Sequence, residues 1–168
     1  MKEYQKWLKT IAEIALIVLV MYAVICLINS VGMAEETYTQ AWIVCQPNDY
    51  VNARLKPNGR SRKVGLLDPG DEILLDGKEK NGYLHCVGMF ETEAWVFSGY
   101  VVYEKPVRVN AHAYVISKGD LQARKCIGGK RRCWLKTGDE IEVRWWTGEW
   151  CVTNKGFVMT RYLEMEGV

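Results

Sequence analysis

Covalent chemistry in this chain would depend on its six cysteines and two histidines. A cysteine nucleophile needs a histidine base within reach and a third group that orients the base. His85 precedes Cys86, but neighbouring residues on a strand point to opposite faces of a sheet, so their side chains would not meet. The chain has no C-x-x-C pair, and His85 and His112 stand alone in the sequence. We therefore expect no enzyme, no catalytic residue, no metal and no cofactor.

A second chemical feature is a basic stretch in the C-terminal half, beside Trp134. Its positive charges are Lys125, Lys130, Arg131, Arg132 and Lys136. Residues 35–104 contain seven Lys and Arg against eleven Asp and Glu, whereas residues 105–168 contain twelve against seven. A basic loop beside an aromatic ring could bind a phosphate-rich polymer. It could equally be a solvated loop, or a patch that docks on the acidic first half.

Two cysteines flank this basic loop. Cys126 and Cys133 are separated by six residues, so a disulfide could close the loop and contribute about 2 kcal/mol if it were unstrained. The alternative is that most cysteines of the chain are small core residues. Spacing alone does not decide between them.

Aromatic residues are numerous, with seven Trp, nine Tyr and three Phe. Rings near loops can stack on sugars or pack against peptides, while neighbouring polar groups fix the orientation of the ligand. The candidate ligand-binding residues are Tyr50, Arg54, Tyr83, Trp95, Trp134, Trp145 and Trp146. Trp145 and Trp146 are adjacent, so at least one ring points outward unless it meets another domain.

The elements that position these residues form an internal repeat. The segment Val51–Arg54, a polar loop, a short strand and the turn at Gly70–Asp71 return as Leu121–Arg124, a loop, a strand and Gly138–Asp139. The offset between the copies falls from 70 to 62 residues along the chain, because loops absorb deletions that strands cannot. We expect strands at 42–46, 50–54, 64–67, 72–75, 83–87 and 93–97. Alternation places Ile73, Leu75, Leu84, Cys86, Ile141, Val143, Trp150 and Val152 in the cores.

This pattern resembles the bacterial SH3-like (SH3b) domain. The residues that carry the resemblance in the first copy are Val51-Asn-Ala-Arg54, Val64-Gly65, Gly70-Asp71, Asn81-Gly82-Tyr83, Ala94-Trp-Val96 and Tyr100-Val101. The second copy matches more loosely, through Ala123-Arg124, Gly138-Asp139, Gly148-Glu-Trp150, Gly156-Phe-Val158 and Tyr162-Leu163. In the second copy Gln122 replaces the Asn and Cys133 stands where Gly65 stood. The resemblance implies an all-β chain of two tandem small SH3-like barrels after one N-terminal hydrophobic helix.

The N-terminal segment indicates export. Lys2, Lys6 and Lys9 precede a run of 21 residues without charge, Ile14 to Ala34, and such a segment inserts with its N-terminus in the cytoplasm. Gly32-Met-Ala34 could be a cleavage site, but the run is also long enough to be retained as an anchor. The predicted domains are a signal peptide or transmembrane anchor at 1–34, a tether at 35–41, and SH3b-like domains at 42–104 and 105–168.

The function implied by the resemblance is non-catalytic binding to cell-wall peptidoglycan or its peptides. The protein would lie outside the cytoplasm, either anchored with its C-terminus outside or secreted to the wall. The basic loop could add teichoic acid as a ligand, and nucleic acid is not expected as a partner outside the cell. The alternative is an extracytoplasmic protein–protein interaction module of a membrane-associated assembly.

Overall fold

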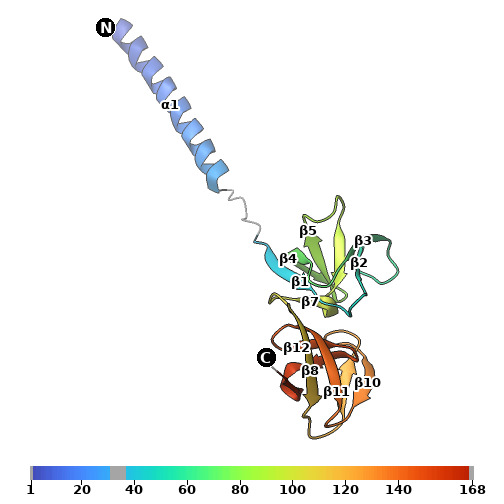
Figure 1. Ribbon diagram of the computed structural model, residues 1–168. Coiled ribbons are helices and arrows are strands. Elements are labelled where there is room, and N and C mark those ends of the chain that lie inside the picture. The colour runs from blue at the N-terminus through green and yellow to red at the C-terminus, as the bar shows by residue number, and fades with distance from the viewer. Residues whose placement is uncertain (1, 31–36, 167–168) are drawn as a thin grey trace. The chain divides into compact units, whose positions relative to one another are not determined.

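The computed structural model describes residues 2–30 and 37–166. It divides into two compact units, Met1–Glu36 and Thr37–Val168. The first contains one helix, α1 (Lys2–Ser30), shown in blue in Figure 1. No helix in the described part of the chain has the length and apolar character needed to cross a membrane. The proposed cleavage site at Gly32–Ala34 lies outside the described residues, so that prediction is not tested.

The second unit contains two antiparallel sheets of seven strands each, and the first is built from residues 39–102. Its strand order is β3-β2-β6-β5-β4-β1-β7. A short 3-10 helix, η1 (Ser98–Tyr100), leads into the last strand. The strands are β1 (Thr39–Ile43), β2 (Val51–Arg54), β3 (Lys63–Leu67), β4 (Glu72–Lys80), β5 (Tyr83–Val87), β6 (Ala94–Phe97) and β7 (Val101–Val102).

The second sheet repeats this topology between residues 107 and 165. Its order, β10-β9-β13-β12-β11-β8-β14, is the first order with every strand number raised by seven. A 3-10 helix, η2 (Thr160–Tyr162), again precedes the last strand. The strands are β8 (Val107–Val115), β9 (Leu121–Arg124), β10 (Arg131–Leu135), β11 (Glu140–Trp146), β12 (Trp150–Thr153), β13 (Gly156–Met159) and β14 (Leu163–Met165).

The two copies share individual hydrogen bonds as well as strand order. In the Gly-Asp turn of the first copy, the Asp71 carboxylate accepts the backbone N–H of Asp68 at 2.8 Å. In the second, Asp139 accepts the N–H of Lys136 at 2.7 Å. The glycine before each aspartate has a positive φ, 97° at Gly70 and 85° at Gly138, a conformation that costs glycine little. This chemistry explains why the Gly-Asp pair occurs at the same place in both copies.

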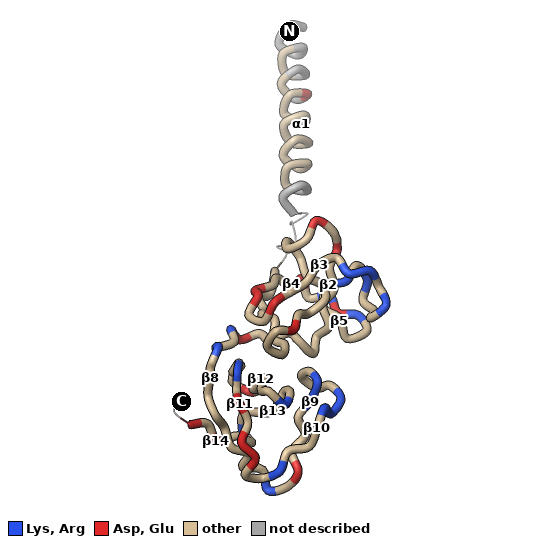
Figure 2. The backbone as a smooth tube through the Cα atoms, turned by 45° about the vertical axis from the view of Figure 1, so that its right-hand side comes forward, with Lys and Arg blue, Asp and Glu red and all other residues tan. Residues whose placement is uncertain are grey.

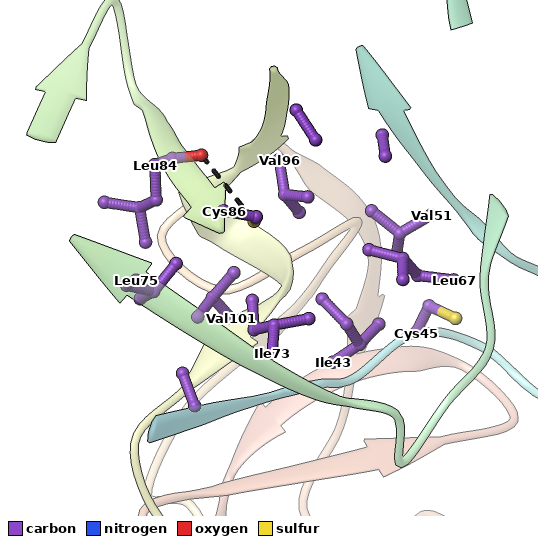
Figure 3. Packing of buried hydrophobic residues seen from close by; sticks show 13 residues of the cluster. Ile43, Cys45, Val51, Leu67, Ile73, Leu75, Leu84, Cys86, Val96 and Val101 are labelled. Carbon is purple, nitrogen blue, oxygen red and sulfur yellow. Dashed lines mark hydrogen bonds between the residues drawn. The ribbon is translucent and has the colours of Figure 1, made fainter. Parts of the chain in front are cut away.

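Each sheet encloses its own apolar core. Ile43, Val51, Leu67, Ile73 and Val96 converge in the first (Figure 3), and each is at most 3 % exposed. The second core contains Ala113, Val115, Ala123, Leu135, Ile141, Val143, Cys151 and Val158. Alternation predicted Ile73, Leu75, Leu84, Cys86, Ile141 and Val143 correctly, since all six belong to these clusters.

One part of the predicted core is wrong. Trp150 and Val152 were expected in the core of the second sheet, but Cys151, which lies between them on β12, occupies that position. Val152 is fully buried and Trp150 half-buried in a third cluster, which joins the two sheets. The prediction therefore assigned the two faces of β12 the wrong way round, since Cys151 faces the core of the second sheet and Trp150 and Val152 face away from it. Both faces of β12 are apolar because each packs against protein, so alternation carries no information about direction there.

The third cluster forms the contact between the sheets. Val44 and Val102 of the first sheet and Val152 and Phe157 of the second are buried in it. The Phe157 ring lies 6.3 Å from the ring of Tyr100, centroid to centroid. A backbone hydrogen bond of 2.9 Å from Ile127 N–H to the Gly99 carbonyl also joins the copies. The two sheets are thus joined by buried apolar side chains and by a backbone hydrogen bond.

The predicted strand positions agree closely with the structure. Each of the six ranges expected in the first copy overlaps an observed strand, and 83–87 matches β5 (Tyr83–Val87) at both ends. The largest difference is β4, which runs to Lys80 instead of Leu75 and carries a register shift between Leu75 and Glu79.

Gly156 provides a test of this architecture. It has φ of 136°, and a Cβ added there would lie 2.5 Å from the backbone carbonyl oxygen of Arg124 on the neighbouring strand. We expect Gly156→Ala to lower the free energy of unfolding by about 3 kcal/mol, because strained dihedrals and a backbone clash combine. Guanidinium denaturation measures the change.

The control is Gly119→Ala. Nothing lies within 4 Å of a Cβ at Gly119, and its φ is not in the positive range. A change within about 0.5 kcal/mol is expected. Equal effects of the two substitutions would contradict the close approach of β9 and β13 at Gly156.

Candidate functional site

The most distinctive surface feature is a groove that occurs in both copies. In the first sheet it has a volume of about 270 Å³ and lies on the outer side of β2, β5 and β6, next to η1. We call it the first groove. Its lining residues are Val51, Asn52, Arg54, Tyr83, Phe97 and Tyr100. Aromatic rings form one wall: Tyr83 meets Phe97 edge to face at 5.4 Å, and Phe97 meets Tyr100 at 6.1 Å.

The second groove lies at the matching place on the second sheet and is larger, about 510 Å³. Six of its lining residues occupy the positions equivalent to the first groove: Leu121, Gln122, Arg124, Trp150, Met159 and Tyr162. The match extends to strand register, because Tyr83 pairs with Phe97 across β5 and β6, and Trp150 pairs with Met159 across β12 and β13. Both copies therefore place a carboxamide, an arginine, an aromatic ring and a tyrosine around one hollow.

Each groove arginine holds the loop that follows it. Arg54 donates from Nη1 to the Ser61 carbonyl at 2.8 Å, and Arg124 donates from Nη1 to the Gly129 carbonyl at 2.7 Å. Charge-assisted hydrogen bonds of this length are among the stronger ones in proteins. The arginine of the Asn-x-Arg pattern therefore positions the loop beside the groove and also lines the groove.

The carboxamide is the polar group best placed to meet a ligand. Asn52 Oδ1 is buried and has no hydrogen-bond partner, and a buried unsatisfied acceptor is costly unless a ligand donor satisfies it. Gln122 stands at the same position of the second groove. Burial raises the pKa of Tyr100, with Cys126 and Asp49 adding to the effect. The Tyr100 hydroxyl stays protonated at neutral pH and can donate.

Positive charge follows the groove arginine along the chain in both copies, and Figure 2 shows it as blue segments between β2 and β3 and between β9 and β10. The second basic stretch is the predicted one, and its five basic side chains are all exposed. The first contains Lys56, Arg60, Arg62 and Lys63 and was not predicted, because the overall acidity of the first copy concealed it. The basic loop is therefore a repeated feature rather than a property of the second copy alone.

The ligand-binding residues predicted from the sequence do not form one site in the structure. Arg54 and Tyr83 belong to the first groove. Trp134 is 48 % exposed on β10, with the Arg131 guanidinium 4.5 Å above its ring. Tyr50 is exposed beside Lys63, whose Nζ lies 5.9 Å from the ring centroid.

Trp145 and Trp146 do not form one exposed pair. Trp146 packs on the second core and donates from Nε1 to the Gly148 carbonyl at 3.1 Å. Trp145 packs in the cluster between the sheets, where a Cβ at Gly70 would lie 3.2 Å from its ring. The prediction allowed that one ring could meet another domain instead of pointing outward, and Trp145 meets the first copy in this way.

Trp95 lies against a histidine–aspartate pair instead of in the first groove. The rings of Trp95 and His85 are 4.8 Å apart, and His85 Nδ1 lies 2.9 Å from Asp76 Oδ2. Burial alone would raise the pKa of Asp76, but hydrogen bonds from Lys78 and His85 lower it to about 2. The His85–Asp76 pair therefore connects β5 to β4 through their side chains.

The cysteines are free thiols in this structure. Cys126 is buried close to Gly99 and Gly129, whereas Cys133 donates to the Lys155 carbonyl. No bridge joins Cys126 and Cys133 here, so their pairing stays a prediction. Burial, with a smaller effect of nearby acidic groups, raises the pKa values of Cys45 and Cys86 to about 12, and such thiols do not ionise at neutral pH.

The catalytic and metal-binding alternatives can be examined in the described part of the chain. Cys86 lies in the first core, while the His85 ring is directed to Asp76 on the other side of β5. No cluster of three His, Cys, Asp or Glu side chains within residues 2–30 and 37–166 is placed to hold a metal ion.

Sequence reasoning omitted Asn52 and Phe97 of the first groove and most of the second groove. The signal was present, because Asn52 is the first polar residue of the Asn-x-Arg pattern and alternation places it on the same face as Arg54. The alignment of the two copies already related Gln122 to Asn52, whereas the equivalence of Trp150 and Tyr83 follows only from the strand register.

No protein-family model matches the chain, and no curated protein matches it. Among solved structures, it is similar to NlpC1 from Trichomonas vaginalis, with a TM-score of 0.33 and 13 % identity over 79 % of this chain and 48 % of that one. It is also similar to NlpC2 from the same organism, with a TM-score of 0.34 and 12 % identity over 78 % of this chain and 49 % of that one. The chain spans about half the length of these two structures.

The His85–Asp76 pair generates a pH-dependent prediction. Folding lowers the pKa of Asp76, so the ionised carboxylate stabilises the folded protein. This contribution is present above pH 4 and is lost as the pH falls through about 2. We expect Asp76→Asn to lower the free energy of unfolding at pH 7 by about 1 to 2 kcal/mol and to have little effect near pH 2. Urea denaturation across this pH range measures the difference.

The matched control is Glu140→Gln. His112 Nδ1 lies 2.6 Å from Glu140 Oε1, but both side chains are more than half exposed, at 57 % and 54 %. An exposed pair contributes little, so this substitution should leave stability almost unchanged. If the free energies of unfolding of Asp76→Asn and the parent differed by the same amount at every pH, the role of the His85–Asp76 pair would be contradicted.

Proposed function

We propose that this chain is an exported, non-catalytic binding protein whose two sheets are SH3b-like domains that recognise peptides of cell-wall peptidoglycan. The observation that carries the proposal is the pair of equivalent grooves, in which six positions match in strand and register. A surface that is retained in two diverged copies favours a binding role over an accident of packing.

The groove chemistry suits a peptide. A peptide offers N–H donors to the carboxamide oxygen of Asn52 or Gln122, and carbonyl acceptors to the tyrosine hydroxyl and the arginine. The aromatic walls can cover small aliphatic side chains. Export is supported by the basic residues before the uncharged run at 14–34, and binding without catalysis by the position of Cys86 in the first core, while the His85 ring contacts Asp76 instead of the thiol.

The two basic loops support an additional, electrostatic part of wall binding. Each loop follows an arginine that lines a groove, so an anionic wall polymer such as teichoic acid could associate there while a peptide occupies the groove. The alternative occupant of the grooves is a segment of an extracytoplasmic protein in a membrane-associated assembly.

Replacing the carboxamide of each groove, by Asn52→Ala combined with Gln122→Ala, tests whether the grooves bind the cell wall. Each substitution removes one ligand hydrogen bond of about 1 kcal/mol, so the double variant should bind insoluble walls about thirtyfold more weakly. Co-sedimentation of the full-length chain with walls stripped of teichoic acid, at high salt, measures the affinity. Arginine variants are less suitable because Arg54 and Arg124 also hold their loops.

The control is Gln40→Ala, which removes an exposed amide on β1 outside both grooves. It should bind as the parent does. Equal pelleting of the double variant and the parent would refute recognition through the grooves. If the parent itself fails to pellet, the wall is not the ligand and a protein partner becomes the better interpretation.

The basic loops generate a separate prediction. Arg131→Gln with Arg132→Gln should flatten the salt dependence of binding to walls that retain teichoic acid, because fewer counterions are released. Binding to stripped walls should hardly change. The comparison is Lys80→Gln with Lys105→Gln, which removes the same charge from exposed positions elsewhere. The same flattening in both double variants would show that only net charge matters, not the loops.

A further inference from the structure

A third hollow, distinct from both grooves, lies between the two sheets within the compact unit Thr37–Val168. We call it the inter-sheet cleft, and its volume is about 620 Å³. The turns after β1 and before β4 contribute Gln46, Asn48 and Pro69, and the strands β8 and β11 contribute Arg108, Asn110 and Arg144. The remaining lining residues are Pro47, Trp145 and Asn154.

The cleft is rich in hydrogen-bond donors. Two arginines and four carboxamide side chains line it, and none of the described residues that line it is acidic. The carboxamide oxygens of Asn110 and Asn154 already accept bonds, from Arg144 Nη1 at 3.2 Å and from Glu142 N–H at 3.3 Å. Their amide nitrogens are left as donors.

Gln46 supplies a separate indication of a ligand. Its Nε2 is buried and has no hydrogen-bond partner. A buried amide donor of this kind costs free energy until something accepts from it. The side chain lines the cleft, so an acceptor bound there would satisfy it.

The charges in the cleft favour an anionic ligand. Arg144 is paired with Glu142, which neutralises it in part, whereas Arg108 is exposed and lies next to Asn110 on β8. An arginine fork can hold a carboxylate or a phosphate through two parallel hydrogen bonds.

Trp145 supplies the apolar surface. One part of its ring packs on the Gly70 turn and the sheet interface, and the rest lines the cleft. An indole face beside several amide donors is the combination that binds a sugar ring, because the ring stacks while its hydroxyl groups accept hydrogen bonds.

From these contacts we infer that the inter-sheet cleft is a binding site for a saccharide that carries an anionic group, with the anion at Arg108 and the sugar ring on Trp145. The site is independent of the two grooves, since it shares no lining residue with either. It exists only because the two copies are packed together.

The test is calorimetric titration of the full-length chain with three probes: an oligogalacturonate, glucose 1-phosphate and a neutral glucose oligomer. Saturable binding of the carboxylate probe, the phosphate probe or both is expected, and the comparison identifies which anion the cleft prefers. Binding of the neutral oligomer with equal affinity, or no saturable binding by any probe, would overturn the inference.

Substitutions inside and outside the inter-sheet cleft test whether the probes bind there. Arg108→Gln should weaken binding at least about tenfold, whereas Lys80→Gln, at an exposed position on β4 outside the cleft and the basic loops, should change it less than about twofold. Equal losses in the two variants would mean non-specific attraction and would overturn the assignment.

Gln46→Leu separates binding from stability. Because this change removes an unsatisfied buried donor, the melting temperature of the free protein should be maintained or raised, while the affinity for the anionic probe should fall about fivefold or more. Unchanged affinity in this variant would remove Gln46 from the site. Failure in these titrations with normal wall pelleting would refute the cleft alone and leave the groove proposal standing.

Discussion

The buried contact between the two sheets is the constraint on which the other surfaces depend. Val44 and Val102 pack against Val152 and Phe157, and each of these four side chains is at most 8 % exposed. Burial of this kind is stabilising and non-directional, but the hydrogen bond from Ile127 to the Gly99 carbonyl adds a fixed register. The β9–β10 loop is therefore anchored to the first copy as well as to its own sheet.

The same contact shows how the repeat has diverged. Val152 and Phe157, which pair across β12 and β13, are equivalent to His85 and Trp95, which pair across β5 and β6. In the second copy these positions are apolar and buried against the first copy. In the first copy they have no second sheet to meet, and the histidine is instead held by Asp76 under the tryptophan ring. The same position thus serves packing between the sheets in one copy and a largely buried histidine–aspartate contact in the other.

This divergence also explains what could be predicted from the sequence. Strands, Gly-Asp turns and the core positions Ile73 and Ile141 follow from local alternation and turn chemistry, and the structure confirms them. The reversed faces of Trp150 and Val152 and the position of Trp145 depend on contact between the copies, which no local pattern encodes. Arg54 and Tyr83 of the first groove were predicted because they belong to the local pattern of one repeat, whereas the inter-sheet cleft, which needs both copies, was not predicted.

Two similar grooves on one compact unit have a consequence for affinity. If each binds a short segment weakly, a polymer that presents the same segment repeatedly can occupy both, and the second association is then intramolecular. The grooves need not be identical for this, and they are not: the second is larger and adds Arg161, whose guanidinium lies 4.9 Å above the Tyr162 ring. The buried contact between the sheets limits how far the two grooves can move relative to each other, which favours polymers whose repeated segments have a matching spacing. The inter-sheet contact would therefore contribute to selectivity without touching the ligand.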